Sequence, residues 1–317
     1  MSTLRFISRA VVVLTLSLTG CGTDGAGGGS GGDADGGGGG GDADGGGGGG
    51  DQWQTLITGD WQLAPGSEDY WCARVTIPET IYVNGFRSLA PDGTHHTVLT
   101  VQDSGDDGQF GCSAGTLADE MVFASGVGTD ALTFPEGVAI KLEAGRKLLL
   151  NLHLYNVSDQ AISGTSGTEV KVIPASEVQE EAEMVFGGTF QIYLPPGQQT
   201  TLSGRCVFNN DATVISVWPH MHQVGVHMKV THEGAGGNVV LHDQPFSFAE
   251  QTNWPIAPEV VKAGEDILTE CTWDNTTSSA IAFGDSSEAE MCFAGLYRYP
   301  RDGSSLFCTD GFTPPGF

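Results

Sequence analysis

Residues 213–230, TVISVWPHMHQVGVHMKV, carry both the pattern that decides the fold and the first sign of a functional site. Val, Ile and Trp dominate the stretch, and this composition is typical of a β-strand. Side chains at positions i and i+2 of a strand point to the same side, so His220 and His222 share one face. Two imidazoles on one face are either half of a metal site or an ordinary pair of surface histidines.

Runs of the same kind recur along the chain, separated by clusters of Gly, Pro, Asn and Asp. Many short strands with turn-rich connections favour β-sandwiches or barrels over βαβ units. One segment, 175–186, has a helical pattern, polar and weakly amphipathic. The acidic stretch 176–183 divides the folded part into halves. We therefore predict an all-β chain with two tandem domains, residues 52–180 and 181–317.

The N-terminus has the features of an export signal. Arg5 and Arg9 precede an apolar run, residues 10–18, that is too short to span a bilayer as a mature helix. The run ends in the letters LTGC, which resemble a bacterial lipobox. We predict that residues 1–20 are a signal peptide and that Cys21 is lipidated, which would make the protein an exported bacterial lipoprotein anchored on the periplasmic face or at the cell surface. The alternative is an ordinary cleaved signal peptide followed by an incidental cysteine.

Residues 21–51 consist almost entirely of Gly and Asp after the cysteine, and such a chain cannot bury a core. We interpret them as a flexible linker. Beyond them, 11 Lys and Arg face 33 Asp and Glu. Phosphate binding needs clustered basic residues, so nucleic acid is excluded as a predicted partner.

Six cysteines remain after Cys21, and an even number in an exported protein favours disulfides. Their spacing leaves the connectivity open. The chain has no CxxC pair for a zinc-thiolate site and no HExxH motif for a zinc hydrolase.

The histidines are the strongest candidates for metal ligands, because imidazole suits copper and zinc. His95 and His96 are adjacent, so they can bind one ion only if their strand ends, twists or bulges there. His153 lies in another strand-like run. Met291 stands in a polar segment, SSEAEMC, where a gap-filling core role is the alternative. Its thioether is a soft ligand suited to Cu(I).

Four motifs in this order, HHT, LHLYN, HMHQVG and SSEAEMC, resemble those of the copper type II, ascorbate-dependent monooxygenases, the family of peptidylglycine α-hydroxylating monooxygenase and dopamine β-monooxygenase. The resemblance runs from about Cys72 to Tyr299. It implies two antiparallel β-sandwiches, jelly-roll-like, with a solvent-filled cleft between two copper ions. It assigns an electron-storing copper to His95, His96 and His153, and a catalytic copper that binds O2 to His220, His222 and Met291.

The resemblance also implies three disulfides and a reductant. The cysteine pairs that match the family are Cys72–Cys112, Cys206–Cys308 and Cys271–Cys292. Ascorbate, or another one-electron reductant, would supply electrons to both coppers.

The chain departs from the peptide-amidating members of the family beside the catalytic copper. Those members have Arg and Asn where this chain has Trp218 and Phe293. Aromatic side chains cannot pair with a carboxylate, so we predict a small apolar or aromatic substrate that contacts these two residues. The alternative is that both rings pack inside the sandwich.

The function predicted from these residues is hydroxylation of a substrate C–H bond by a copper-dependent monooxygenase. One alternative is a non-enzymatic copper-binding surface lipoprotein, for sequestration or delivery. Another is a tethered β-sandwich that binds a sugar or a protein and carries incidental histidines. That alternative leaves Met291 and the ordered motifs unexplained.

Overall fold

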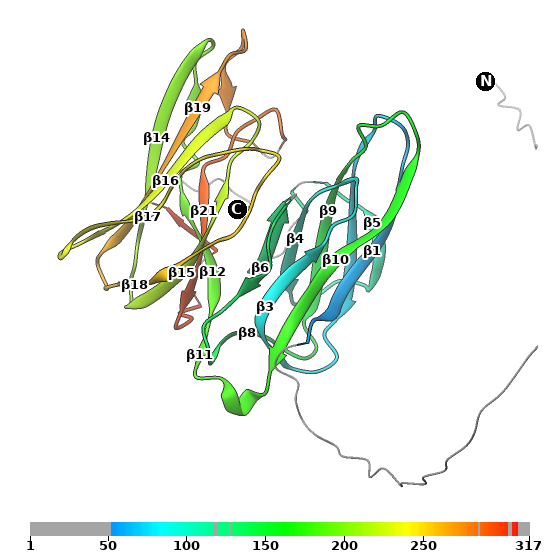
Figure 1. Ribbon diagram of the computed structural model, residues 1–317, viewed down its shortest axis with the longest axis horizontal. Coiled ribbons are helices and arrows are strands. Elements are labelled where there is room, and N and C mark those ends of the chain that lie inside the picture. The colour runs from blue at the N-terminus through cyan, green and yellow to red at the C-terminus, as the bar shows by residue number, and fades with distance from the viewer. Residues whose placement is uncertain are drawn as a thin grey trace, which may run out of the picture. The chain divides into compact units, whose positions relative to one another are not determined.

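The computed structural model describes residues 52–113, 115–116, 120–126, 128–284, 286–303 and 306–309. Within these ranges the chain is built of β-strands with a single 3-10 turn, η1 (Ala175–Glu177), so the prediction of an all-β protein is confirmed (Figure 1). The signal peptide, Cys21 and the Gly/Asp linker lie outside the described residues. No helix in these ranges has the length and hydrophobicity that a membrane crossing needs.

Two sheets are formed by the first half of the chain, almost entirely by antiparallel pairing. The first sheet has the order β1-β10-β3-β8-β11, with β7 paired to β3, and the second has the order β5-β2-β9-β4-β6. Their strands are β1 (Gln54–Leu63), β2 (Glu68–Thr76), β3 (Ile81–Leu89), β4 (Thr94–Gln102), β5 (Gly108–Gly111), β6 (Glu120–Gly126), β7 (Leu132–Thr133), β8 (Val138–Leu142), β9 (Lys147–Tyr155), β10 (Ile162–Ile173) and β11 (Glu180–Glu181).

The second half forms two larger sheets, β18-β15-β21-β12-β22 and β14-β19-β16-β17, and the short pair β13-β20. Their strands are β12 (Glu183–Gly188), β13 (Tyr193–Leu194), β14 (Gln198–Val207), β15 (Ala212–His220), β16 (Gly225–Gly234), β17 (Gly237–Pro245), β18 (Trp254–Val261), β19 (Asp266–Asn275), β20 (Ile281–Ala282), β21 (Phe293–Tyr299) and β22 (Phe307–Thr309).

Burial along the strands follows the two-residue period of a pleated sheet. In β19 every second residue is buried, among them Ile267, Cys271 and Trp273, and its other face is more exposed. In β9 seven consecutive residues are buried, because this strand lies inside its sheet and is covered on both sides. The strands β4, β9 and β15, which carry His95, His96, His153 and His220, each have a partner strand on both sides.

The apolar core does not divide at residue 180. One cluster joins Leu99, Phe123 and Leu150 of the first half to Trp218 and Tyr297 of the second. A second cluster, around Trp273, belongs to the second half alone. The two tandem jelly-roll-like domains therefore stay a prediction.

The prediction of a helix over 175–186 is wrong beyond η1. Met184, Val185 and Phe186 are all buried, on both faces of the strand β12. This strand pairs with β21 on one side and with β22 on the other. Burial between two strands outweighed the weak helical pattern of the polar residues before it.

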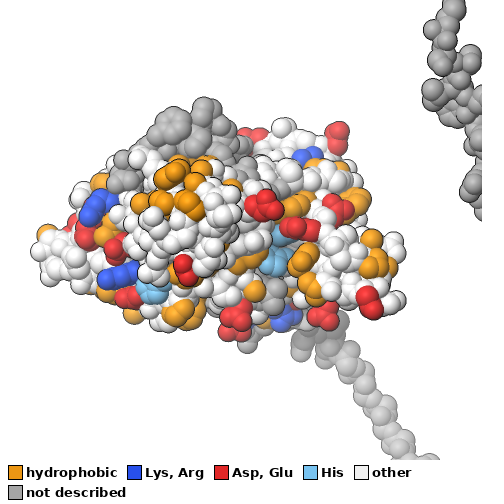
Figure 2. All heavy atoms as spheres, turned by 90° about the horizontal axis from the view of Figure 1, so that it is seen from above, with side chains coloured by type: hydrophobic (Ala, Val, Ile, Leu, Met, Phe, Trp, Pro, Cys, Tyr) orange, Lys and Arg blue, Asp and Glu red, His pale blue; other side chains and the backbone are white. Residues whose placement is uncertain are grey.

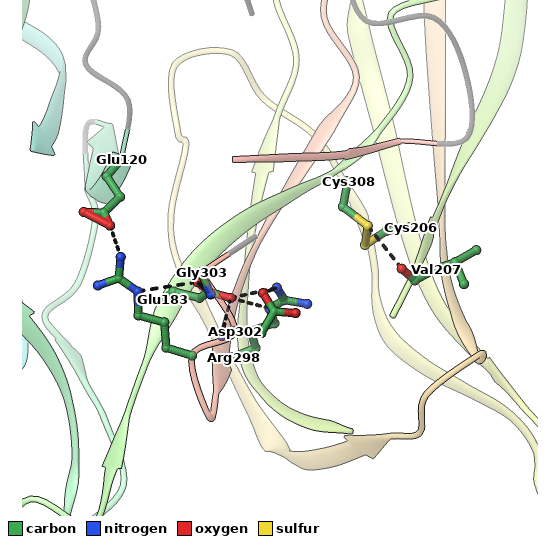
Figure 3. Close-up of polar contacts among 9 residues, drawn as sticks. Glu120, Glu183, Cys206, Val207, Arg298, Asp302, Gly303 and Cys308 are labelled. Atoms are coloured by element: carbon green, nitrogen blue, oxygen red, sulfur yellow. Dashed lines mark hydrogen bonds and ion pairs between the residues drawn. A yellow bond between two sulfur atoms is a disulfide. The ribbon is translucent and has the colours of Figure 1, made fainter. Parts of the chain in front are cut away.

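The three cysteine pairs expected from the family resemblance are disulfides in the structure: Cys72–Cys112, Cys206–Cys308 and Cys271–Cys292. Figure 3 shows the Cys206–Cys308 disulfide and, apart from it, a polar cluster around Arg298, which binds Glu183 and Asp302 at 2.7 and 2.8 Å. In the same region Arg301 pairs with Glu120, which joins the second half of the chain to β6 of the first. Acidic side chains outnumber basic ones on the face drawn in Figure 2, which agrees in sign with the net charge of −26 of the full chain.

Candidate metal centres

The first histidine cluster is built by two neighbouring strands. His96 of β4 is directly opposite His153 of β9, and the register between the strands shifts at His95. This bulge turns His95 towards the side that His96 already faces. Adjacent His95 and His96 could bind one ion only if their strand ends, twists or bulges there, and the strand does bulge at this point.

Three imidazole nitrogens converge in this cluster. The Nδ1 atom of His96 is 3.1 Å from Nδ1 of His95 and 3.3 Å from Nδ1 of His153. Two nitrogens that each bind one ion at about 2.0 Å lie about 2.8–3.5 Å apart. The spacing therefore fits a metal held by three imidazoles, and among the described His, Cys, Asp and Glu residues only these three form such a group.

Glu68 and Tyr70, both in β2, hold the His153 ring. The Nε2–H of His153 donates to Glu68 Oε1 at 2.5 Å, which leaves Nδ1 free as a lone-pair donor. The Tyr70 ring stacks on His153 at 4.4 Å with an interplanar angle of 4°. Burial, more than the charge of Glu68, raises the pKa of Tyr70 to about 12, so its hydroxyl stays protonated at neutral pH.

The environment keeps the histidines of both clusters neutral. Burial lowers the pKa of His95 to about 4 and that of His220 to about 3, and neighbouring histidines add to both effects. Burial also lowers the pKa of His96, of His153 and of His222. Neutral imidazoles are the form that binds metals.

The second cluster lies at the end of β15. His220 is the last residue of the strand and donates its Nδ1–H to Gln251 Oε1 at 2.7 Å. His222 follows in the loop to β16 and donates its Nδ1–H to the Ala289 carbonyl at 3.1 Å. Both rings therefore keep Nε2 free, and the ring centroids are 5.3 Å apart. The second cluster thus offers Nε2 atoms where the first offers Nδ1 atoms.

A buried carboxylate organises the second cluster. Glu290 is 1% exposed and accepts the backbone N–H groups of His222 and Val224 at 2.9 and 2.8 Å. It also accepts the Trp273 indole N–H at 2.8 Å and the Met291 N–H at 3.3 Å. Burial raises the pKa of Glu290, and these four donors oppose that rise. Glu290 thus joins the His222 loop to Met291, the residue predicted as the third ligand. On the other side of Met291, Cys292 forms a disulfide with Cys271.

The predicted substrate contacts lie in the core. Trp218 and Phe293 are each 3% exposed. Trp218 stacks on the His220 ring at 5.0 Å, so it borders the second cluster as its strand position predicts. Phe293 packs against Phe186 and Phe190, which favours the packing alternative for this ring.

The remaining histidines lie outside both clusters. His227 pairs with Asp243 at 3.0 Å, and His242 packs against Trp254. His232 is buried, and its two ring nitrogens bind carboxylates of the residues Glu259 and Glu265.

Sequence reasoning missed the residues that orient the ligands. Glu68, Gln251 and Glu290 are ordinary polar residues in the sequence, and all three lie far along the chain from the histidines that they bind. Only Glu290 carries a signal, since it directly precedes Met291. Asn151, which shares a strand face with His153, does not bind that ring: it donates to the carbonyls of Ser113 and Thr116.

Comparison with known proteins bears on this arrangement. Residues 180–314 match the family model described as the C-terminal domain of copper type II ascorbate-dependent monooxygenases. The matched region contains His220, His222 and Met291. Residues 180–314 of the chain belong to this family.

Two curated relatives are also named as monooxygenase proteins. A human protein named "Putative DBH-like monooxygenase protein 2" is 24% identical over 212 residues, covering 60% of this chain and 42% of that protein. Mouse DBH-like monooxygenase protein 2 is 25% identical over 242 residues, covering 70% of this chain and 37% of that protein. The chain spans about two fifths of the length of these relatives. The monooxygenase family model does not reach His95, His96 and His153. The case for a metal site at the first cluster therefore comes from the geometry of this chain.

Proposed function

We propose that this protein is a copper-dependent monooxygenase that hydroxylates a C–H bond of a small, apolar or aromatic substrate, using O2 and an external one-electron reductant such as ascorbate. The observation that carries the proposal is the convergence of the three Nδ1 atoms of His95, His96 and His153. It supplies a second metal position in the half of the chain that the family model does not cover.

The residues fit copper at both positions. Three imidazole nitrogens at the first cluster, and two imidazole nitrogens with a thioether at the second, are ligands that copper accepts. His95, His96 and His153 would hold one ion, and His220, His222 and Met291 the other. Copper in these sites would supply one-electron chemistry and O2 activation.

The chain's own groups prepare these positions. Glu68, Gln251 and the Ala289 carbonyl hold the ring protons of the ligands on the side away from the free nitrogens. Trp218 stacks on His220, and Phe293 packs nearby in the core. We propose that Trp218 shapes apolar surroundings for the substrate. The jelly-roll-like pair of domains, the two coppers, the lipid anchor at Cys21 and the location at a membrane are parts of the same proposal.

Two measurements together test the function: the number of copper ions bound per chain and the rate of O2 uptake. The full chain should bind two copper ions and consume O2 when ascorbate is supplied. Met291→Ala should lose the uptake while the first site stays filled, and His153→Ala should lose one copper. A wild-type chain that binds one copper or none would contradict the proposal. Two tightly bound coppers, indifferent to Met291 and without uptake in the presence of apolar and aromatic test substrates, would indicate a copper carrier instead.

A further inference from the structure

The side chain of Phe248 lies between the two histidine clusters. Its ring centroid is 4.7 Å from that of His95 in the first cluster and 6.2 Å from that of His222 in the second. The planes are tilted by 39° to His95 and by 79° to His222, so the phenyl ring meets one imidazole obliquely and the other edge-on. Phe248 is only half-buried, in contrast to Trp218 and Phe293.

The backbone around Phe248 is fixed to both halves of the chain. Gln251, which binds His220 through Oε1, donates from Nε2 to the Phe248 carbonyl at 3.2 Å. The Gln251 carbonyl accepts the Gly126 N–H at 2.9 Å, and Gly126 pairs with His96 across β6 and β4. Asn253 adds a bond to the Ala124 carbonyl at 2.9 Å.

The backbone of Gln251 packs tightly against Gly126. A Cβ atom at Gly126 would come within 2.9 Å of the Gln251 nitrogen. The segment 246–253, between β17 and β18, therefore packs directly on the strand beside the first cluster while it binds a ligand of the second. Its position sets where the Phe248 ring can lie.

We infer that Phe248 fills the gap between the two clusters and excludes water from it, so that this gap is apolar, in contrast to the solvent-filled cleft that the family resemblance implies. The inference rests on the proposed function, in which both clusters are copper sites. Phe248 is a positioning residue: it separates the sites and forms an apolar wall beside His222. An apolar wall at that place favours an apolar group of a substrate over a charged one.

The test compares Phe248→Leu and Phe248→Ala with a matched control, Phe246→Leu. Phe246 lies in the same segment, but it packs on the core of the second half, where it faces Gly225. In the metal-free full chain, loss of the Phe248 ring current should shift the ring protons of both His95 and His222 in NMR spectra. The control should leave both in place. Shifts at one histidine alone, or at neither, would overturn the inference whether or not the protein binds copper.

The second readout is water access to bound copper. In the Cu(II)-loaded full chain, Phe248→Ala should raise the water-proton relaxation rate to about twice the wild-type value, because truncation opens room for exchanging water. Phe248→Leu should stay near wild type, and the copper count should not change in either variant. Equal relaxation rates in wild type and Phe248→Ala would overturn the claim that the ring keeps water out. A wild-type chain without copper would instead contradict the proposed function, and the NMR shifts would still decide the position of Phe248.

Discussion

The two histidine clusters are assembled in different ways. The first is set by the register of β4 and β9 and by one bulge at His95, so its three histidines all lie within two paired strands. The second combines the end of β15, a loop and the residue before β21, and one buried carboxylate holds these pieces together. A cluster set by sheet register should withstand the loss of one supporting side chain better than a cluster held by a loop.

The largest effect is expected at Glu290. Glu290→Ala leaves four N–H donors without their acceptor in a buried place, so we expect the free energy of unfolding to fall by about 3–5 kcal/mol. The second cluster should lose copper and the first should keep it. Urea unfolding and copper counting measure the two effects.

Glu290→Gln keeps one acceptor oxygen and serves as the control, with an intermediate loss. Equal copper loss at both clusters in Glu290→Ala would show that this carboxylate supports the whole fold and not the second cluster.

The disulfides give the next comparison. Cys271–Cys292 closes a loop of 21 residues and ends beside Met291, so replacing both cysteines by Ala should cost about 3 kcal/mol and weaken copper binding at the second cluster. Replacing Cys72 and Cys112 should destabilise the protein without changing the second cluster. Calorimetry measures the stability of both variants, and copper titration measures their affinity at the second cluster. Identical copper affinities in the two variants would show that the Cys271–Cys292 disulfide has no special role at the second cluster.

The strand pattern of the sequence predicted the all-β fold. The i, i+2 rule predicted that His220 and His222 share one strand face; the two rings do lie close together, although the strand ends at His220 and His222 lies in the loop that follows. The bulge at His95 could be stated only as a condition, because register shifts depend on the partner strand. Glu68, Gln251 and Phe248 could not be predicted, since their contacts join segments that only the tertiary fold brings together. The helix expected over 175–186 failed for the same reason.

A smaller effect concerns pH. Burial lowers the pKa of His242 to about 4, from 6.5 in an unfolded chain. The unfolded state therefore binds the proton first, so stability is complete above pH 6.5 and is lost as the pH falls towards 4. The loss from this residue should be about 1–3 kcal/mol. Urea unfolding of wild type and His242→Gln between pH 4 and 7 measures it; parallel curves would show that His242 does not contribute.

The smallest effect is expected at Glu68, which is partly exposed. Glu68→Ala should weaken copper binding at the first cluster about tenfold, because the His153 ring loses the acceptor that orients it. Glu68→Gln retains an acceptor oxygen and should stay close to wild type. A competition titration with a copper chelator compares them, and equal affinities in all three proteins would show that the strand register alone orients His153.

The most direct test of two different copper sites is X-ray absorption of the Cu(I)-loaded full chain. The proposed function predicts two coppers per chain, with imidazole nitrogen at both and a sulfur neighbour at one, and Met291→Ala should remove the sulfur signal while the first cluster keeps its copper. A single copper, or two coppers with no sulfur neighbour in the wild type, would contradict the assignment of His220, His222 and Met291 as a copper site.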